Sequence, residues 1–273
     1  MAPRVPGLEP GRGASAASVR RVPPRDVPAE AISDLVGALA YGELTAFTRL
    51  AADARLAPTL RDEVALAGYA ARRFRDFRTL ADHLTALGLD PELAMSPFVA
   101  PLDAFHDKTE PSDFLEGLVK AFVGDGIARD FYREVADLLT AAAEAPTRAL
   151  LLEVLVEPRG AADYVIATVR AAMRTDRAVG GRLALWGRRL VGEALAQTQH
   201  AAAERDALIQ LISERGDLTD LVGLLSRVTQ AHTARMDALG LSGCARPSDV
   251  RDRYGAAATG RSSDGRRRPG PPR

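Results

Sequence analysis

One acidic residue, Glu43, interrupts an apolar stripe that has the period of an α-helix. The stripe runs through Ile32, Val36, Leu39 and Phe47, and Glu43 falls between the last two. Burying an unpaired carboxylate is expensive, so we expect either a metal ion or a basic side chain to face Glu43. The remaining alternative is that Glu43 lies at the edge of its helix in contact with water, as glutamate commonly does.

A second stripe carries a basic residue where an apolar one is expected. Leu66, Ala70, Arg73 and Phe77 follow each other at spacings of four, three and four, and Asp76 lies one turn beyond Arg73. Arginine stays protonated and can donate two parallel hydrogen bonds to a carboxylate. Arg73 is therefore a candidate partner for a buried glutamate.

Further acids accompany two later helical stretches. Glu116 is flanked by Leu115 and Leu118, although Asp125 and Asp130 are rival carboxylates for the inward face of the same helix. His106 follows Asp103 by three residues, which is a spacing typical of metal ligands. It falls in a proline-rich connection, so we expect a structural or exposed histidine.

The elements that must position these side chains are helical. Apolar periodicity, glycine and proline predict six helices and an irregular stretch with Pro91, Pro97 and Pro101 between the second and third. The helices are expected over about 30–56, 59–88 (ending at Gly88 as a C-cap), 111–143, 146–174 (with Pro158 inside), 178–214 and 217–239. One long crossover with otherwise short connections is typical of a four-helix bundle with two additional C-terminal helices.

Composition agrees with an all-α protein. Alanine and leucine are abundant, aromatic residues make up 5% of the chain, and no alternating strand pattern occurs. No apolar run approaches the roughly 20 residues that a membrane span needs. The single cysteine, Cys244, excludes an intramolecular disulfide and fits a reducing cytoplasm. We expect a cytoplasmic protein without a membrane partner.

Charge divides the chain into three parts. Residues 1–29 carry a net charge of +3, residues 243–273 carry +5, and the remainder carries −8. We predict a disordered basic tail over 1–29, a helical domain over 30–241 and a disordered Arg/Pro/Gly-rich tail over 242–273. An acidic body repels phosphate backbones, so any contact with tRNA or other RNA would have to come from the tails. A homodimer formed through exposed helix faces is a further alternative.

Three segments resemble a known family. The runs AYGELTAF at residues 40–47, EGLVKAFVGDG at 116–126 and LWGRRLVGEAL at 185–195 are similar to actinobacterial ferritin-like proteins related to the tRNA hydroxylase MiaE. The resemblance implies a ferritin-like bundle over about 30–241. In the active relatives it implies a carboxylate-bridged di-iron centre that hydroxylates an isopentenyl group on a tRNA adenosine.

The residues that should hold the iron are replaced. Such sites take one Glu from each of two helices and a Glu-x-x-His pair from each of two others. Glu43 and Glu116 match the single-Glu positions, whereas Arg73 and Asp76 occupy the positions of one Glu-x-x-His pair, and no Glu-x-x-His occurs anywhere in the chain. We expect an ion network of Glu43, Arg73 and Glu116, with Glu43, Glu116 and Asp76 as vestigial metal ligands.

Two functional hypotheses follow from that replacement. The first is a metal-free, non-catalytic scaffold or interaction protein without a cofactor. The alternative is a working iron-dependent oxygenase or hydroxylase that acts on a modified tRNA adenosine or a related substrate with a carboxylate-rich site.

Overall fold

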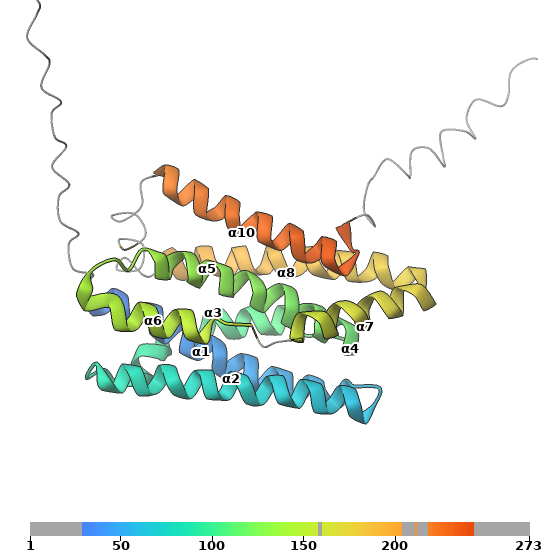
Figure 1. Cartoon of the computed structure of the whole chain (residues 1–273), viewed down its shortest axis with the longest axis horizontal. Helices are drawn as coiled ribbons and strands as arrows, with labels where there is room; N and C mark the ends of the chain where they lie inside the picture. Colours follow the sequence, from blue (N-terminus) through green and yellow to red (C-terminus); the bar gives the residue numbers. More distant parts are fainter. Residues whose placement is uncertain (1–28, 158–159, 204–210, 212–217, 243–273) are drawn as a thin grey trace, which may run out of the picture.

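In the computed structural model, which describes residues 29–157, 160–203, 211 and 218–242, the described residues form helices and no strand. Figure 1 shows long helices lying roughly side by side, with α2 along one edge and α10 along the opposite edge. The all-α bundle predicted from the sequence is therefore confirmed. The two predicted tails lie outside the described residues. No helix among the described residues has the length and apolarity to cross a membrane.

The helices follow each other in this order: α1 Ala29–Asp53, α2 Leu60–Ala86, α3 Pro91–Lys108, α4 Phe114–Val119, α5 Asp125–Asp137, α6 Ala145–Val154, α7 Ala161–Thr175, α8 Arg177–Ala203 and α10 Leu218–Leu239. Short 3₁₀ turns cover Ala54–Leu56 and Ala142–Glu144, and a π-helical segment, Lys120–Gly124, joins α4 directly to α5.

Capping residues bound the second predicted helix at both ends. The hydroxyl of Thr59 accepts a hydrogen bond from the backbone N–H of Asp62 and begins α2. Gly88 follows the end of α2 with a φ of +77°, a conformation that only glycine adopts readily. The predicted bounds of the first two helices differ from the observed ones by three residues or fewer at each end, and the 3₁₀ turn Ala54–Leu56 accounts for the largest difference.

The proline-rich stretch is a helix, α3, so its prediction as irregular is wrong. The side chain of Asp90 accepts hydrogen bonds from the N–H groups of Glu92 and Leu93, and Pro91 occupies the first turn, where it needs no N–H partner. Pro97 and Pro101 each remove one backbone hydrogen bond inside the helix. Packing of one face of α3 against α1 compensates for that loss.

The fourth predicted helix is interrupted, and its prediction as a single kinked helix is wrong. α6 ends at Val154, and α7 begins at Ala161 after Gly160, whose φ is +78°. The third predicted helix is shorter than expected, because it begins at Phe114, capped by Asp113, and ends at Asp137. The predicted end of the fifth helix lies outside the described residues.

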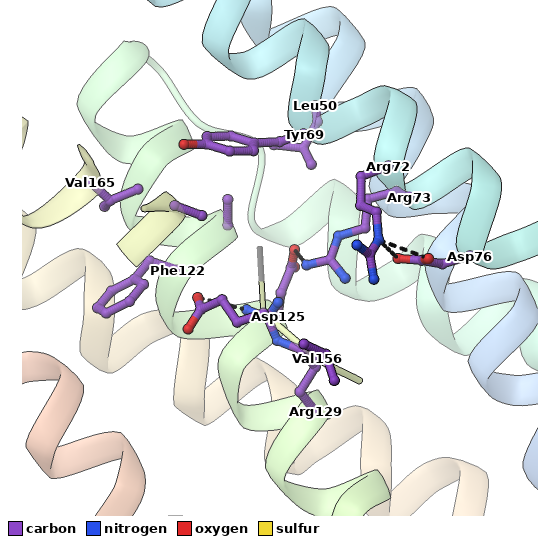
Figure 2. A pocket seen from close by; sticks show the side chains of 13 residues that line it. Leu50, Tyr69, Arg72, Arg73, Asp76, Phe122, Asp125, Arg129, Val156 and Val165 are labelled. Carbon is purple, nitrogen blue, oxygen red and sulfur yellow. Dashed lines mark hydrogen bonds and ion pairs between the residues drawn. The ribbon is translucent and has the colours of Figure 1, made fainter. Parts of the chain in front are cut away.

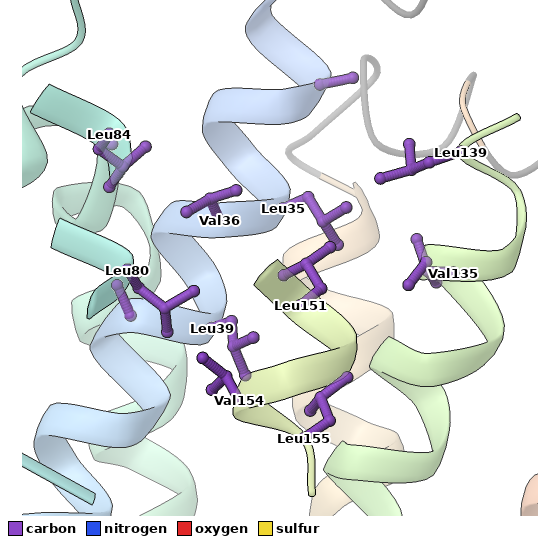
Figure 3. Packing of buried hydrophobic residues seen from close by; sticks show 14 of the residues in the cluster. Leu35, Val36, Leu39, Leu80, Leu84, Val135, Leu139, Leu151, Val154 and Leu155 are labelled. Carbon is purple, nitrogen blue, oxygen red and sulfur yellow. The ribbon is translucent and has the colours of Figure 1, made fainter. Parts of the chain in front are cut away.

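Two apolar clusters fill the bundle. The first contains Leu35 and Leu39 of α1, Leu80 and Leu84 of α2, and residues of α3, α5 and α6 (Figure 3). The second cluster contains Ala54, just after the end of α1, and Leu66, near the start of α2. It also contains residues of α4, the π-helical segment, α7, α8 and α10. Charged side chains occupy the level between the two clusters.

The backbones of α1 and α3 approach each other closely at Gly37. A Cβ atom at this position would lie 2.6 Å from the carbonyl carbon of Ala94 and closer still to its oxygen. We expect Gly37→Ala to lower the free energy of unfolding by about 1–3 kcal/mol, because the helices must separate to admit the methyl group.

Gly42 provides the matched control on the same helix. A Cβ at Gly42 meets no atom within 4 Å, so Gly42→Ala should stabilise the protein by about 0.5–1 kcal/mol through helix propensity alone. Urea denaturation of both variants measures the two effects. Equal stability of the two variants would contradict the close packing at Gly37.

Candidate functional site

Three helices carry charged side chains at the same level of the bundle. On α1, Glu43 lies between the first apolar cluster and Ala54 of the second; on α2, Arg73 lies between Leu66 and Leu80. Asp125, at the start of α5, likewise separates the residues of the π-helical segment from Val135. Each of the three charged residues interrupts the apolar stripe of its own helix, and the three side chains meet in one layer of the bundle.

Arg73 connects the other two charges. Its Nη1 atom donates to both carboxylate oxygens of Glu43, at 3.1 Å each, and its Nη2 atom donates to Oδ2 of Asp125, also at 3.1 Å. The Arg73 side chain is 10% exposed and that of Glu43 is 5% exposed. We call these three residues the Arg73 network.

Burial and neighbouring charges set the protonation of the network. Burial raises the pKa of Glu43 to about 7, although the charge of Arg73 opposes this rise. Burial lowers the pKa of Arg73, but the charges of Glu43 and Asp125 outweigh that effect and raise it above its ordinary value. Arg73 therefore remains a cation, and the carboxyl of Glu43 is the group in the network that titrates near neutral pH.

A π-helical segment, Lys120–Gly124, lies between the two candidate carboxylates, Glu116 and Asp125. In an uninterrupted α-helix, nine residues separate Glu116 from Asp125 by about 180° around the helix axis. The wider turn over Lys120–Gly124 takes up an additional residue and changes the direction of everything that follows. It places Asp125 towards α2, while Glu116 faces another part of the molecule.

The structure does not bring Glu116 to the Arg73 network. One oxygen of Glu116 accepts hydrogen bonds from the backbone N–H and the hydroxyl of Ser112, and the other accepts from Arg182 of α8. The indole N–H of Trp186 donates to the backbone carbonyl of Glu116 at 3.0 Å. Glu116 thus connects the start of α4 to α8. Asp125 occupies the position in the network that we expected Glu116 to occupy.

Asp76 lies beside the network without joining it. Both of its carboxylate oxygens accept from Nε of Arg72, at 2.9 Å each. Burial raises the pKa of Asp76, and Arg72 and Arg73 oppose this rise. Asp76 therefore pairs along its own helix, with the residue four positions earlier, rather than across the bundle.

A second group of buried polar residues lies between α1, α3 and the π-helical segment. His106 is buried, and its Nε2 atom lies 3.2 Å from the hydroxyl of Thr45. Lys120 donates to the carbonyl oxygen of Thr109 at 2.7 Å, and burial lowers the pKa of Lys120 to about 8. Burial and the charges of Lys120 and Arg49 lower the pKa of His106 to about 3. A neutral imidazole bonded to a hydroxyl agrees with the structural role expected for His106.

A pocket opens on one side of the Arg73 network (Figure 2). Its cavity volume is about 40 Å³, and the space reaches about 500 Å³ only when the open solvent at the mouth is included, so the pocket is a shallow site that opens to solvent. Figure 2 shows Val165 and Phe122 on one side, Arg72 and Arg73 on the other, and Tyr69 above them. The pocket thus combines an apolar wall with a charged wall. The sequence analysis missed two of its charged residues, Arg72 and Arg129, because neither interrupts an apolar stripe.

The residues at the centre of the bundle do not fit a di-iron site. Iron in ferritin-like bundles takes carboxylates and two imidazoles, whereas both oxygens of Glu43 here accept from Arg73, whose charge is permanent. Within the described part of the chain, no group of three or more His, Cys, Asp or Glu side chains is arranged to hold a metal ion. Asp125 accepts from the same guanidinium, so a cation already lies between the acids.

Comparison with known proteins bears on the family alone. A family model described as a ferritin-like domain of actinomycetes matches residues 27–215, which is more than half of the chain. A search of curated proteins finds no match. The matched residues include the Arg73 network and the whole bundle up to α8. The chain therefore belongs to the family of ferritin-like domains of actinomycetes.

Proposed function

We propose that this protein is a ferritin-like bundle that works without a metal, as a non-catalytic scaffold or interaction protein. The observation that carries the proposal is the position of Arg73, whose guanidinium donates three hydrogen bonds to Glu43 and Asp125 at the level where the helices carry their charges. A buried cation stabilises neighbouring carboxylates as a metal ion would. It offers no open coordination position for oxygen.

An exposed apolar stripe on α2 supports the interaction role. Leu60 is 74% exposed, Val64 is 63% exposed and Phe74 is 39% exposed, and alanines at 67 and 71 continue the same stripe between them. Residues at spacings of four and three share one face of a helix. Figure 1 shows that α2 lies at an edge of the bundle. Exposed apolar stripes of this kind are typical of protein–protein contacts.

The alternative is the iron-dependent oxygenase that the resemblance to MiaE-like tRNA hydroxylases implies. The pocket beside Arg73 is the observation in its favour, because a substrate needs room next to the reacting centre. In that case iron would have to displace Arg73 from both Glu43 and Asp125.

Metal content decides between the two functions. We expect that protein produced in iron-supplemented medium contains no stoichiometric iron, manganese or zinc by elemental analysis. Arg73→Gln is the informative variant, because it removes the cation while leaving Glu43, Asp76 and Asp125 in place. Metal bound to this variant but not to the wild type would show that Arg73 excludes it. About two irons in each wild-type chain would overturn the proposal and support the oxygenase.

A further inference from the structure

Of the three arginines that line the pocket, Arg129 makes the fewest hydrogen bonds to carboxylates within the described residues. Arg73 donates three hydrogen bonds to carboxylates, and Arg72 donates to both oxygens of Asp76. Arg129 makes one long contact, 3.4 Å from its Nη2 atom to Oε1 of Glu157. Within the described ranges of the chain it has no other hydrogen-bond partner, although its side chain is only 10% exposed.

The partner of Arg129 is itself poorly held. The Glu157 side chain is 41% exposed, so water can hydrate its carboxylate if the contact to Arg129 opens. Burial, together with the charge of Arg73, lowers the pKa of Arg129, and the charges of Asp125, Glu157 and Glu43 oppose this effect. Arg129 remains a cation, and the guanidinium N–H groups that do not donate to Glu157 can donate to a further acceptor.

The rest of the pocket is suited to an apolar body. Leu50, Tyr69, Phe122 and Val165 line it, and Val156, which is 56% exposed, lies at its mouth. Figure 2 shows Arg129 and Val156 together on one side of the pocket, with Tyr69 opposite them. A ligand can thus bring a charged end to Arg129 while its apolar end lies against the aromatic rings.

The charges of the pocket limit the ligand to a single negative charge. Asp76 and Asp125 line the same cavity and would repel a dianion such as phosphate. A monoanion that displaces Glu157 from Arg129 replaces one negative charge beside the guanidinium with another, so the charge balance around Arg129 stays the same. A carboxylate fits this requirement and matches the planar fork of arginine.

We propose that this pocket binds a small organic carboxylate with an apolar body, whose carboxylate takes the place of Glu157 on Arg129. The inference goes beyond the metal-free role, because Arg129 and Glu157 are not part of the Arg73 network. Metal analysis tests the metal-free role and ligand titration tests the carboxylate site, so either proposal can be wrong while the other holds.

Titration calorimetry of the full chain with octanoate tests the proposal. Octylammonium, with the same apolar body and the opposite charge, and inorganic phosphate, with charge and no apolar body, are the comparison probes. We expect saturable binding of octanoate alone. Arg129→Gln should weaken octanoate at least ~10-fold, the value of a lost hydrogen bond between charged groups.

The variant Glu157→Gln has the opposite expected effect and lies at a partly exposed position, where folding is not at risk. It removes the internal competitor for Arg129, so octanoate should bind it ~3-fold more tightly or better. Arg148→Gln, at an exposed position outside the pocket, where Arg148 pairs with Asp137, is the control and should bind octanoate like the wild type. Equal binding of octylammonium or phosphate, weaker octanoate binding by Glu157→Gln, or no saturable octanoate binding would overturn the proposal.

Discussion

At pH 8, where the carboxyl of Glu43 is ionised, replacing Arg73 with alanine should lower the free energy of unfolding by about 3–5 kcal/mol, the usual cost of removing one partner from a buried ion pair. The variant removes the two hydrogen bonds from Nη1 of Arg73 that compensate the charge of Glu43, whose side chain is 5% exposed. Asp125 loses the same partner, but its side chain is 23% exposed and can recover hydration. Most of the expected loss therefore arises at Glu43.

The double variant Glu43→Gln with Arg73→Met removes both buried charges and should be milder. A buried ion pair replaced by neutral groups of similar volume often costs little, because the desolvation of two charges disappears together with their attraction. Thermal and urea denaturation of the single and double variants measure the difference. Arg49→Ala is the control for an exposed pair, since Arg49 and Asp107 are 37% and 73% exposed; its effect should stay below about 1 kcal/mol. Equal destabilisation of Arg73→Ala and the double variant would contradict a charge network at this level of the bundle.

Sequence periodicity was sufficient to predict that a basic side chain could face Glu43, because a stripe of helical spacing says which residues point inward. It was not sufficient to choose between Glu116 and Asp125 as the third member. The two carboxylates lie on different sides of the helix, and the π-helical segment Lys120–Gly124 between them changes the direction of Asp125 by an amount that the sequence does not reveal. Nothing in a regular helical period anticipates such a segment.

Two predictions that depended on proline were wrong: the irregular stretch is a helix, and the fourth helix is interrupted. In α3, Pro97 and Pro101 lie inside a helix, because the cap at Asp90 and the contact with α1 outweigh two missing backbone hydrogen bonds. Between α6 and α7 the chain leaves the helix altogether, and Gly160 begins the next one. Tertiary packing decides between these outcomes, and a single sequence does not contain it.

The pocket could not be predicted from the sequence for a related reason. Arg129 lies on α5, and it does not interrupt an apolar stripe strongly enough to be noticed in the sequence; only the fold brings it beside Glu157, which follows α6. Glu43 and Arg73 could be found because each contradicts the apolar pattern around it. Residues that meet only at the surface of a cavity produce no such contradiction.

The titration of Glu43 should make stability depend on pH between about 4.5 and 7. Burial raises its pKa from 4.5 to about 7 in the folded protein. Between these values the folded state binds more protons than the unfolded state, so the free energy of unfolding falls as pH rises. The stabilising contribution is complete below pH 4.5 and is lost as pH rises through 7, with a total of about 3 kcal/mol.

Glu43→Gln isolates this effect, because the amide does not titrate. Asp53, whose pKa burial raises to about 6, contributes to the same window and is present in both proteins. Urea denaturation from pH 4.5 to 8 should show the stability of the wild type falling relative to that of Glu43→Gln as pH rises. Parallel curves for the two proteins would mean that Glu43 is already ionised at pH 4.5, held in that state by Arg73. The same measurement therefore tests whether desolvation or the attraction of Arg73 dominates at the centre of the bundle.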